Sequence, residues 1–526
     1  MAEWDYLKTA LAAGRIGRRE FMSRAAALGV SAALADSVLA GAAFAAETPK
    51  KGGHLILGLN GAASGDSLDP ATYTATFAQV LGQQLYNTLT EVDEKVKVQP
   101  ALAESWEGKP GAKEWIFKLR KGVTFHNGKT LTAADVVYSL NHHRAKDSKS
   151  AAKALLASIS EIKASAPDEV TITLESGNAD MPYIVADYHL GIGPEGTKFD
   201  GVGTGCYILE SFEPGVRART KINPNKWRSD RGFVESVETL AINDTTARVN
   251  ALISGSAHLI NRVDPKTVGL LKNNKKVVVH EIAGAAHYTF PMRCDMAPFD
   301  NKDFRLAMKY AIDREAIVKT VLLGHGKVGN DQPIATFDPY YAADIPQYKF
   351  DPDKAKFHLK KSGFSGQVVL TVSDGAFTGA VDAAQLFQAS AGKAGITLLI
   401  DRVPADGYWD NVWLKKPFCA SYWDGRPTAD QMLTVVYKSD APWNESFWKR
   451  PDFDKLLIEA RAELDPAKRK QMYHDLELMI HDDSGNIIPM FNNTIDAGAS
   501  KVKGFVPTPT LQMSGYRATE KVWLEA

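Results

Sequence analysis

Apolar and polar residues alternate along several short stretches of this chain with the two-residue period of a half-buried strand. Residues 114–119 and 169–174 show this pattern, and residues 54–58 are a further strand candidate. Other stretches repeat their apolar residues every three or four positions, which is the period of a helix with one buried face. Strands and helices are mixed along the chain without strict alternation. The pattern therefore predicts an α/β protein.

Helix boundaries are marked by residues that satisfy free backbone groups. Thr132 and Asp135 match a capping box, in which each side chain bonds to the backbone of the other residue at a helix start. Asp465-Pro466 separates two helical stretches, because proline is tolerated in the first turn of a helix and not in its interior. The sequence predicts helices that begin after Thr132 and Asp351 and that occupy residues 304–321, 456–462 and 469–481.

The first 45 residues have the features of a secretory signal peptide. The pair Arg18-Arg19 precedes a weakly apolar stretch rich in Ala and Gly, which ends in an A-x-A motif at residues 43–45. A membrane-anchoring helix is the alternative, but Asp36 would place a charge in the bilayer, where it is costly. We therefore predict a twin-arginine signal peptide over residues 1–45, cleaved after Ala45, and a mature protein in the periplasm.

Composition narrows the class of function. The 526-residue chain is long enough for several domains, and its 44% hydrophobic and 24% charged residues are ordinary for a globular protein. The 62 Lys and Arg balance 62 Asp and Glu, so no basic excess favours nucleic acid as a partner. Cys206, Cys294 and Cys419 lack the short spacing of a zinc site. One disulfide with one free thiol, and three free thiols, are both compatible with the sequence.

Several short motifs resemble catalytic or cofactor sites but lack the context that the chemistry needs. Residues 191–196 match G-x-G-x-x-G, yet Pro194 lies within the motif and a loop-forming sequence follows in place of a helix facing a pyrophosphate. Ser150 and Lys153 match S-x-x-K without its companion motifs. The adjacent His142 and His143 would point in different directions on a helix and could not share a metal. We expect no enzyme activity, no metal and no cofactor.

Short blocks, distributed in order along nearly all of the predicted mature chain, resemble one protein family. Each block alone is weakly specific, whereas their common order is specific. The blocks are Gly52-Gly53 with 66–70, then 100–106, 119–128, 132–136, 203–207, 223–227, 298–300, 305–314 and 351–363. Together they resemble the peptide/nickel-type (family 5) extracellular solute-binding proteins of ABC importers, which include dipeptide- and oligopeptide-binding proteins.

The resemblance implies a two-lobed periplasmic binding protein fold with a ligand cleft between the lobes. The first lobe is expected to hold residues 46–290 and 490–526, and the second lobe residues 291–489. A peptide or peptide-like solute would bind in the cleft, and a monomer that closes about its hinge would deliver the solute to the ABC permease and ATPase subunits in the inner membrane. Asp135 and Arg305 are expected to be structural markers, as a helix cap and as the partner of a nearby carboxylate.

One departure from the family pattern bears on the ligand. Trp423, Asp424 and Gly425 resemble a W-x-G-D loop whose aspartate pairs with the α-ammonium group of a peptide, but this chain has Arg426 at that position. A guanidinium favours a carboxylate, sulfate or phosphate and repels an ammonium. The hypothesis is a modified peptide with an anionic or oxygen-rich group; the alternative cargo is an opine, an anionic amino-acid conjugate or an oligosaccharide. Alternatively, Arg426 pairs with Asp430 on the surface.

The remaining candidates for ligand contact follow from the same expected cleft. Clefts that bind small polar solutes need aromatic walls and a few charged anchors. Trp409 and Trp413 are expected to be packing residues, and Arg293, near the hinge, is expected either to reach the cleft or to be structural. The predicted ligand-binding residues are Tyr73, Phe77, Arg293, Tyr422, Trp423, Asp424, Arg426, Trp443 and Asn444.

Overall fold

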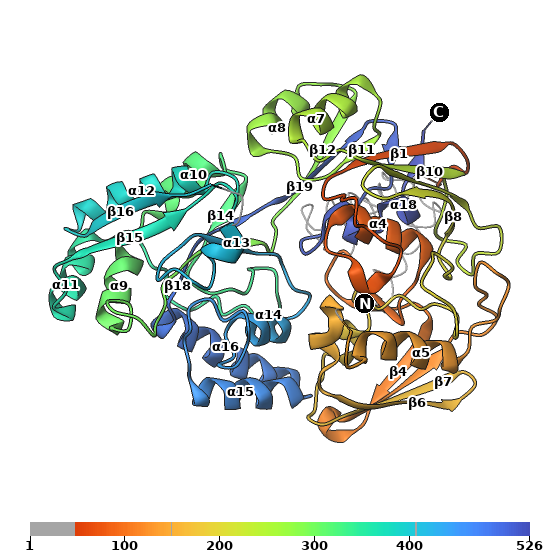
Figure 1. Ribbon diagram of the computed structural model, residues 1–526, viewed down its shortest axis with the longest axis horizontal. Coiled ribbons are helices and arrows are strands. Elements are labelled where there is room, and N and C mark those ends of the chain that lie inside the picture. The colour runs from red at the N-terminus through yellow and green to blue at the C-terminus, as the bar shows by residue number, and fades with distance from the viewer. Residues whose placement is uncertain (1–47, 149, 405–407, 526) are drawn as a thin grey trace, which may run out of the picture.

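The chain folds into two α/β lobes that lie side by side (Figure 1). The computed structural model describes residues 48–148, 150–404 and 408–525. The predicted signal peptide, residues 1–45, lies outside the described residues, and its cleavage stays a prediction. Among the described residues, no helix combines the length and the apolar character needed to span a bilayer.

A seven-stranded sheet forms the centre of the first lobe. Its middle strand is β1 (His54–Leu59), which pairs in parallel with both of its neighbours, while the outer pairs are antiparallel. Helix α4 (Thr76–Leu85) packs against the sheet with every residue buried. The strand order is β12 (Val277–Ile282), β19 (Thr494–Ala499), β11 (Leu259–Ile260), β1, β10 (Ser236–Ala241), β9 (Arg217–Ile222) and β8 (Tyr207–Glu213).

A second, antiparallel sheet extends the first lobe and has its own core. Helix α5 (Ala133–Arg144) packs on it, and the predicted capping box at its start is confirmed: Thr132 donates to Asp135 Oδ2 from its backbone nitrogen at 2.8 Å and from its hydroxyl at 2.9 Å. Strands β5 and β7 span the residues that the alternating pattern predicts. The sheet order is β4 (Ala103–Gly108), β5 (Glu114–Leu119), β7 (Glu169–Leu174) and β6 (Ile159–Ala166).

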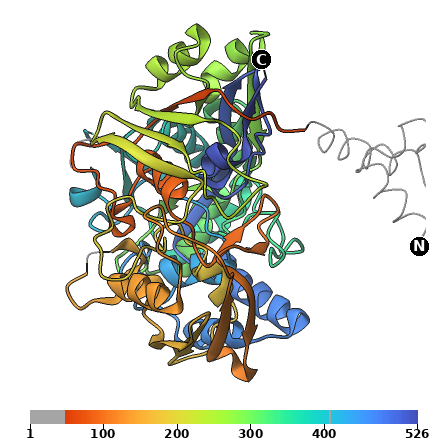
Figure 2. The same ribbon diagram turned by 90° about the vertical axis from the view of Figure 1, so that its right-hand side faces the viewer.

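Smaller elements complete the first lobe. Helices α7 (Thr245–Ser254) and α8 (Pro265–Lys272) cover one end of the large sheet. The start and the end of the described chain meet, because a Cβ built on Gly53 would be 3.0 Å from Leu524 (Figure 2). The other elements are β2 (Thr90–Val92), β3 (Val98–Pro100), α6 (Met181–Ile184), β20 (Val502–Lys503), α17 (Gln512–Gly515), α18 (Ala518–Lys521) and β21 (Trp523–Leu524).

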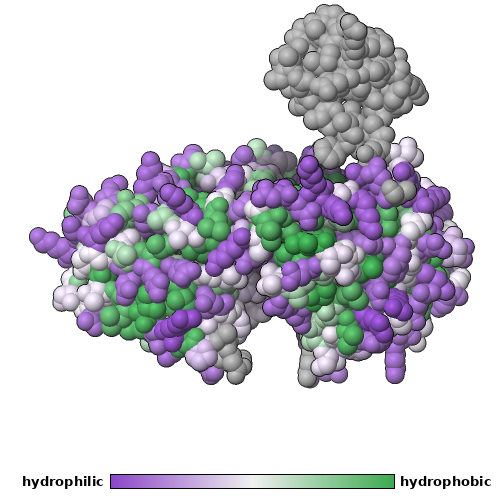
Figure 3. Space-filling model, turned by 90° about the horizontal axis from the view of Figure 1, so that it is seen from above, coloured by the Kyte–Doolittle hydropathy of each residue, from purple (hydrophilic) through white to green (hydrophobic). Residues whose placement is uncertain are grey.

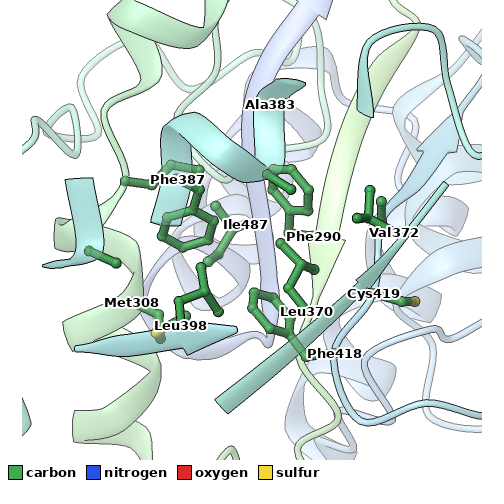
Figure 4. Packing of buried hydrophobic residues seen from close by; sticks show 14 of the residues in the cluster. Phe290, Met308, Leu370, Val372, Ala383, Phe387, Leu398, Phe418, Cys419 and Ile487 are labelled. Atoms are coloured by element: carbon green, nitrogen blue, oxygen red, sulfur yellow. The ribbon is translucent and has the colours of Figure 1, made fainter. Parts of the chain in front are cut away.

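The second lobe is built on a four-stranded antiparallel sheet and a parallel strand pair. Their apolar faces meet in one core, in which Phe290, Leu370, Phe387, Phe418 and Ile487 pack fully buried (Figure 4). The sheet order is β14 (Gly326–Val328), β18 (Asn486–Asn492), β13 (His287–Pro291) and β17 (Ser421–Trp423), and the parallel pair is β15 (Gln367–Val372) with β16 (Thr397–Arg402).

The helices of the second lobe include one correction to the sequence prediction. A single helix over residues 304–321 is wrong, because the backbone is extended at Ile312 and Asp313 begins a new helix by accepting the Ala316 amide at 3.0 Å. The break at Asp465-Pro466 is confirmed. The helices are α9 (Lys302–Ala311), α10 (Arg314–Val321), α11 (Pro352–Ser362), α12 (Ala380–Lys393), α13 (Tyr408–Asn411), α14 (Ala429–Val436), α15 (Pro451–Ala462) and α16 (Pro466–Asp483).

The chain crosses between the lobes twice, and the two crossings lie side by side. One crossing joins β12 to β13, and the other joins β18 to β19. The amide of Asn492 donates to Ala286 O at 3.0 Å, and Asn493 Nδ2 donates to Glu281 Oε1 at 2.6 Å. We call residues 48–282 and 494–525 the first lobe and residues 287–492 the second lobe. The expected boundary at residue 290 therefore falls within β13.

Candidate ligand-binding site

The loop that follows β17 places charged side chains where the lobes meet. Figure 3 shows the surface hollowed between the two masses of the molecule. Gly425 lies against the first crossing, because a Cβ built on it would be 2.6 Å from Ala285 Cβ. Asp424 is exposed and Arg426 is partly exposed. The loop therefore offers one carboxylate and one guanidinium beside the hinge.

The charges of this loop act on residues of the first lobe. Burial raises the pKa of Tyr188, the carboxylates of Asp187 and Asp424 raise it further, and Arg426 lowers it. Burial also raises the pKa of Asp187, but His189, which bonds to its Oδ1 at 2.7 Å, and then Arg426 bring that pKa below its usual range. The loop therefore faces the 187–189 segment across the space between the lobes.

The guanidinium of Arg426 has no carboxylate partner within the described residues. Its Nη1 donates to the carbonyl oxygens of Asp424 and Gly425 at 3.3 and 3.4 Å, which are bonds within its own loop. The expected alternative, a surface pair with Asp430, is wrong. The buried Asp430 carboxylate accepts instead from Arg461 Nε at 2.9 Å. The positive charge of Arg426 is therefore available to a ligand.

A row of four aromatic rings extends from this loop across the second lobe. Successive ring centroids are 5.5 Å apart from Tyr422 to Trp409, 5.8 Å from Trp409 to Trp413, and 6.1 Å from Trp413 to Trp443. Tyr422, Trp409 and Trp443 are 37%, 38% and 48% exposed. Trp409 was expected to be a packing residue, and its exposure instead adds a ring to this surface, which we call the aromatic row.

A buried carboxylate lies behind the aromatic row, and sequence reasoning did not find it. Glu445 is 2% exposed and accepts hydrogen bonds from Trp413 Nε1 at 2.8 Å, from Trp423 Nε1 at 3.0 Å and from the Thr289 hydroxyl at 2.9 Å. Burial raises the pKa of this carboxyl, and the hydrogen bonds from the two indoles oppose the rise. Trp423, a predicted ligand residue, is itself buried beneath the row.

The lobes also touch at the end opposite the crossings. Arg469 in α16 forms an ion pair of 2.8 Å with Asp180 of the first lobe, and the side chains are only 8% and 3% exposed. The amide of Ala179 donates to Arg461 O at 2.8 Å beside this pair. Contacts at both ends close the space between the lobes on two sides.

The family assignment follows from a sequence match that spans more than half of the chain. Residues 97–445 match the model described as bacterial extracellular solute-binding proteins, family 5 Middle. The chain belongs to this family. Its members are substrate-binding proteins that work with the permease and ATPase components of ABC transporters, and the expected two-lobed fold is confirmed.

Relatives of this family 5 protein match over nearly their full length. The glutathione-binding protein GsiB of Escherichia coli O6:K15:H31 is 25% identical over 498 residues, which cover 90% of this chain and 95% of the relative. The dipeptide-binding protein of Escherichia coli K12 is 25% identical, with 85% and 91% covered. The periplasmic binding protein DppA of Helicobacter pylori, solved with the peptide STSA, has a TM-score of 0.76 at 24% identity, with 91% and 99% covered.

Two predicted ligand residues of this family 5 protein use their polar groups in hydrogen bonds within the second lobe. The buried Asn444 donates from Nδ2 to Trp448 O at 2.6 Å. Arg293 donates to Asp295 at 2.7 and 3.0 Å, and its guanidinium lies 3.7 Å from the ring centre of Phe447. Of the two roles expected for Arg293, these contacts favour the structural one. Arg305 also has the structural role expected of it, because it bonds to Asp483 Oδ1 at 2.8 Å.

The two candidates from the first lobe lie in its core. Phe77 is fully buried, and Tyr73 is nearly so, with its hydroxyl donating to Leu68 O at 2.9 Å. The Tyr73 carbonyl accepts from His189 Nε2 at 2.8 Å, which holds the 187–189 segment in place. Contact of either side chain with a ligand stays a prediction.

The sequence left open whether two of the three cysteines form a disulfide. Cys206, Cys294 and Cys419 are all free thiols. Within the described part of the chain, no group of three or more His, Cys, Asp or Glu side chains has the arrangement of a metal site. His142 bonds to Asp69 at 2.9 Å and His143 bonds to Ser150 at 2.7 Å, so the adjacent histidines face different partners.

Proposed function

We propose that this protein is the periplasmic binding component of an ABC importer and that it carries a peptide or peptide-like solute with an added anionic group. Membership of the solute-binding family supports the transport role. The names of the relatives, a glutathione-binding and a dipeptide-binding protein, support a peptide-like cargo. The solute would lie between the lobes, in contact with the loop after β17.

The observation that carries the anionic part of this proposal is the unpaired guanidinium of Arg426. A charge-assisted hydrogen bond from a guanidinium to a carboxylate is stronger than a neutral one and gains further when water is excluded. The exposed carboxylate of Asp424, two residues away, offers a place for an ammonium group of the same solute. The loop therefore offers one partner to each charge of a zwitterionic solute, and the guanidinium adds a carboxylate contact that an aspartate at its position would not provide.

A ligand screen on the purified protein tests this function. Thermal unfolding would be followed with neutral tripeptides, with tripeptides that carry one glutamate, with glutathione, and with opines and oligosaccharides. A ligand present at 100 times its Kd adds about 2.7 kcal/mol to the free energy of unfolding. Stabilisation by glutamate peptides or glutathione above that by neutral peptides supports the proposal. Stabilisation by an opine or an oligosaccharide alone would replace the peptide by the alternative cargo.

The export route is part of the same proposal. Residues 1–45 would act as a twin-arginine signal peptide, and the monomeric mature protein would start after Ala45. N-terminal sequencing of the protein from the periplasm should begin at residue 46. Replacement of Arg18 and Arg19 by lysine should leave the protein in the cytoplasm, and export of that variant would contradict the twin-arginine route. Light scattering of the mature protein would measure its oligomeric state.

A further inference from the structure

The carboxylate of Glu445 accepts a hydrogen bond from two indoles, those of the partly buried Trp413 and the buried Trp423. Trp413 donates to one oxygen and Trp423 to the other. Indole nitrogen is a donor only, so each ring is oriented by the single acceptor that it finds. Thr289 fixes the carboxylate in turn, from the neighbouring strand β13. The arrangement ties two ring planes to one buried side chain.

The two oriented indoles support the exposed rings. The ring centre of Trp443 lies 6.1 Å from that of Trp413 and 6.0 Å from that of Trp423, so Trp443 rests on both. Trp409 packs edge-on to Trp413 at 5.8 Å and to Tyr422 at 5.5 Å. These are distances at which aromatic pairs attract one another. A tilt of Trp413 would therefore separate the two halves of the aromatic row.

The exposed rings of the aromatic row adjoin one another, as Tyr422 and Trp409 show, and so form a contiguous patch in place of scattered apolar side chains. Large contiguous apolar surface in water costs free energy in proportion to its area, and such patches mark binding sites. The row begins at Tyr422, four residues before Arg426. Figure 1 shows α13, which carries Trp409, on the side of the second lobe nearer to the first lobe. Burial raises the pKa of Tyr422, and the carboxylate of Asp424 raises it further. Arg262 of the first lobe and Arg426 oppose this rise.

We infer that Glu445 is a positioning residue of the ligand site: it holds Trp413 and Trp423 so that the aromatic row forms one surface. That surface takes an extended apolar or planar part of the solute whose anionic group lies at Arg426. This inference rests on the proposed function, and it adds a second requirement to the substrate class. The solute is an anionic peptide-like molecule that also carries a large apolar or aromatic side chain.

The substitution Glu445→Gln tests the positioning role. Glutamine keeps one acceptor oxygen but turns an NH₂ group toward an indole donor, so one of the two indoles loses its bond. The matched control is Glu477→Gln, which alters another fully buried carboxylate of the second lobe, bonded to Gln332 and to the Ala342 amide. Both variants lose a buried carboxyl group, and only the first one touches the aromatic row.

Two tripeptides of equal charge serve as probes, Gly-Glu-Gly and Gly-Glu-Trp. Calorimetry should show that Glu445→Gln weakens binding of Gly-Glu-Trp about tenfold, which corresponds to about 1.4 kcal/mol and lies in the range for one lost hydrogen bond. Binding of Gly-Glu-Gly should weaken less than about twofold on the same scale. Glu477→Gln should leave the ratio of the two affinities unchanged. An equal loss for both peptides in Glu445→Gln would overturn the inference.

A ligand-free measurement separates this inference from the proposed function. Acrylamide quenching of tryptophan fluorescence should increase in Glu445→Gln and stay unchanged in Glu477→Gln. Quenching unchanged in both variants would show that Glu445 does not position the row. Should Glu445→Gln fail to fold, Trp443→Ala removes an exposed ring and should lower the affinity for Gly-Glu-Trp alone. If the wild-type protein binds neither peptide, the proposed peptide function fails, and the quenching result still decides the positioning role.

Discussion

Asp180 of the first lobe and Arg469 of the second lobe form a buried ion pair of 2.8 Å at the end of the molecule opposite the hinge. The guanidinium also lies against the rings of Tyr340 and Tyr473, at 5.2 and 5.4 Å from their centres. Separation of the lobes would break this pair and return both charges to water. Loss of one partner would leave the other charge buried without its counterion for as long as the lobes touch here.

Asp180→Asn should weaken ligand binding by favouring the open arrangement. Removal of one partner from a buried ion pair costs on the order of 3 kcal/mol. Here the cost destabilises the closed arrangement relative to the open one, so we expect Kd to rise by about 10- to 100-fold. Calorimetry would measure the Kd, and small-angle scattering would measure the radius of gyration with ligand. The control is Asp230→Asn, which alters an exposed partner of Arg228 within the first lobe. An unchanged Kd in Asp180→Asn would show that the pair does not contribute to closure.

Arg426→Ala should lower the affinity for anionic peptides and leave stability unchanged. The guanidinium bonds only to carbonyl oxygens of its own loop, so its loss should alter the free energy of unfolding by less than about 0.5 kcal/mol. A lost hydrogen bond to a carboxylate costs about 1.5–3 kcal/mol, which raises Kd by about 10- to 150-fold. Titration with Gly-Glu-Gly and with Gly-Gly-Gly measures both affinities. Equal behaviour of the variant and the wild type toward both peptides contradicts an anion contact at this position.

Asp496→Asn should change how stability depends on pH. Burial raises the pKa of Asp496 from 3.8 to about 7, and its Oδ2 accepts the Met513 amide at 2.8 Å. Between about pH 4 and pH 7 the folded protein keeps a proton that the unfolded chain releases, so this group lowers the free energy of unfolding as pH rises through that window. Asparagine does not titrate. The variant should therefore gain stability relative to wild type from pH 4.5 to pH 8, as urea unfolding at both values would show.

Glu91→Gln should destabilise the first lobe at neutral pH. Burial alone would raise the pKa of Glu91, but Arg517, Arg228 and Arg231 lower it from 4.5 to about 2. Its ionised form contributes stability above pH 4.5, and this contribution is lost as pH falls from 4.5 to 2. Loss of the charge leaves three guanidinium groups without their shared partner, at a cost of about 3 kcal/mol at pH 7. Urea unfolding should show a smaller difference at pH 3, and an equal difference at both values would contradict this account.

Local patterns predicted elements that are decided locally. The capping box at Thr132 and the two strands with strict alternation need only neighbours in sequence, and the structure has them where the pattern places them. The helix predicted over 304–321 failed because its apolar spacing continues through Ile312, while the break depends on how Asp313 caps the next turn. Periodicity reports which face is buried and does not report whether the backbone continues.

At the site, too, the sequence predicted features that depend on neighbouring residues and missed contacts between residues far apart in the chain. The position of Arg426 in its loop could be read from the family motif. The alternative surface pair with Asp430 was wrong because Arg461, far along the chain, bonds to Asp430. Glu445 was missed because its role depends on Thr289, Trp413 and Trp423, which meet only in the folded protein. A single sequence contains no signal for that convergence. The exposure of Trp409 was missed for the same reason.

The two crossings between the lobes lie side by side, so the second lobe begins and ends at neighbouring points of the first lobe. Ile282 at the end of β12 is the direct partner of Thr494 at the start of β19, so the second lobe is one continuous insertion into a strand pair. Segments whose ends lie this close are the ones that proteins tolerate as inserted or exchanged domains. A short turn from Ile282 to Thr494 would leave the seven-stranded sheet with all its strand pairs. The loop of Arg426, the aromatic row and Glu445 all belong to the inserted segment, so exchange of that one segment would alter the cargo while the first lobe stayed the same.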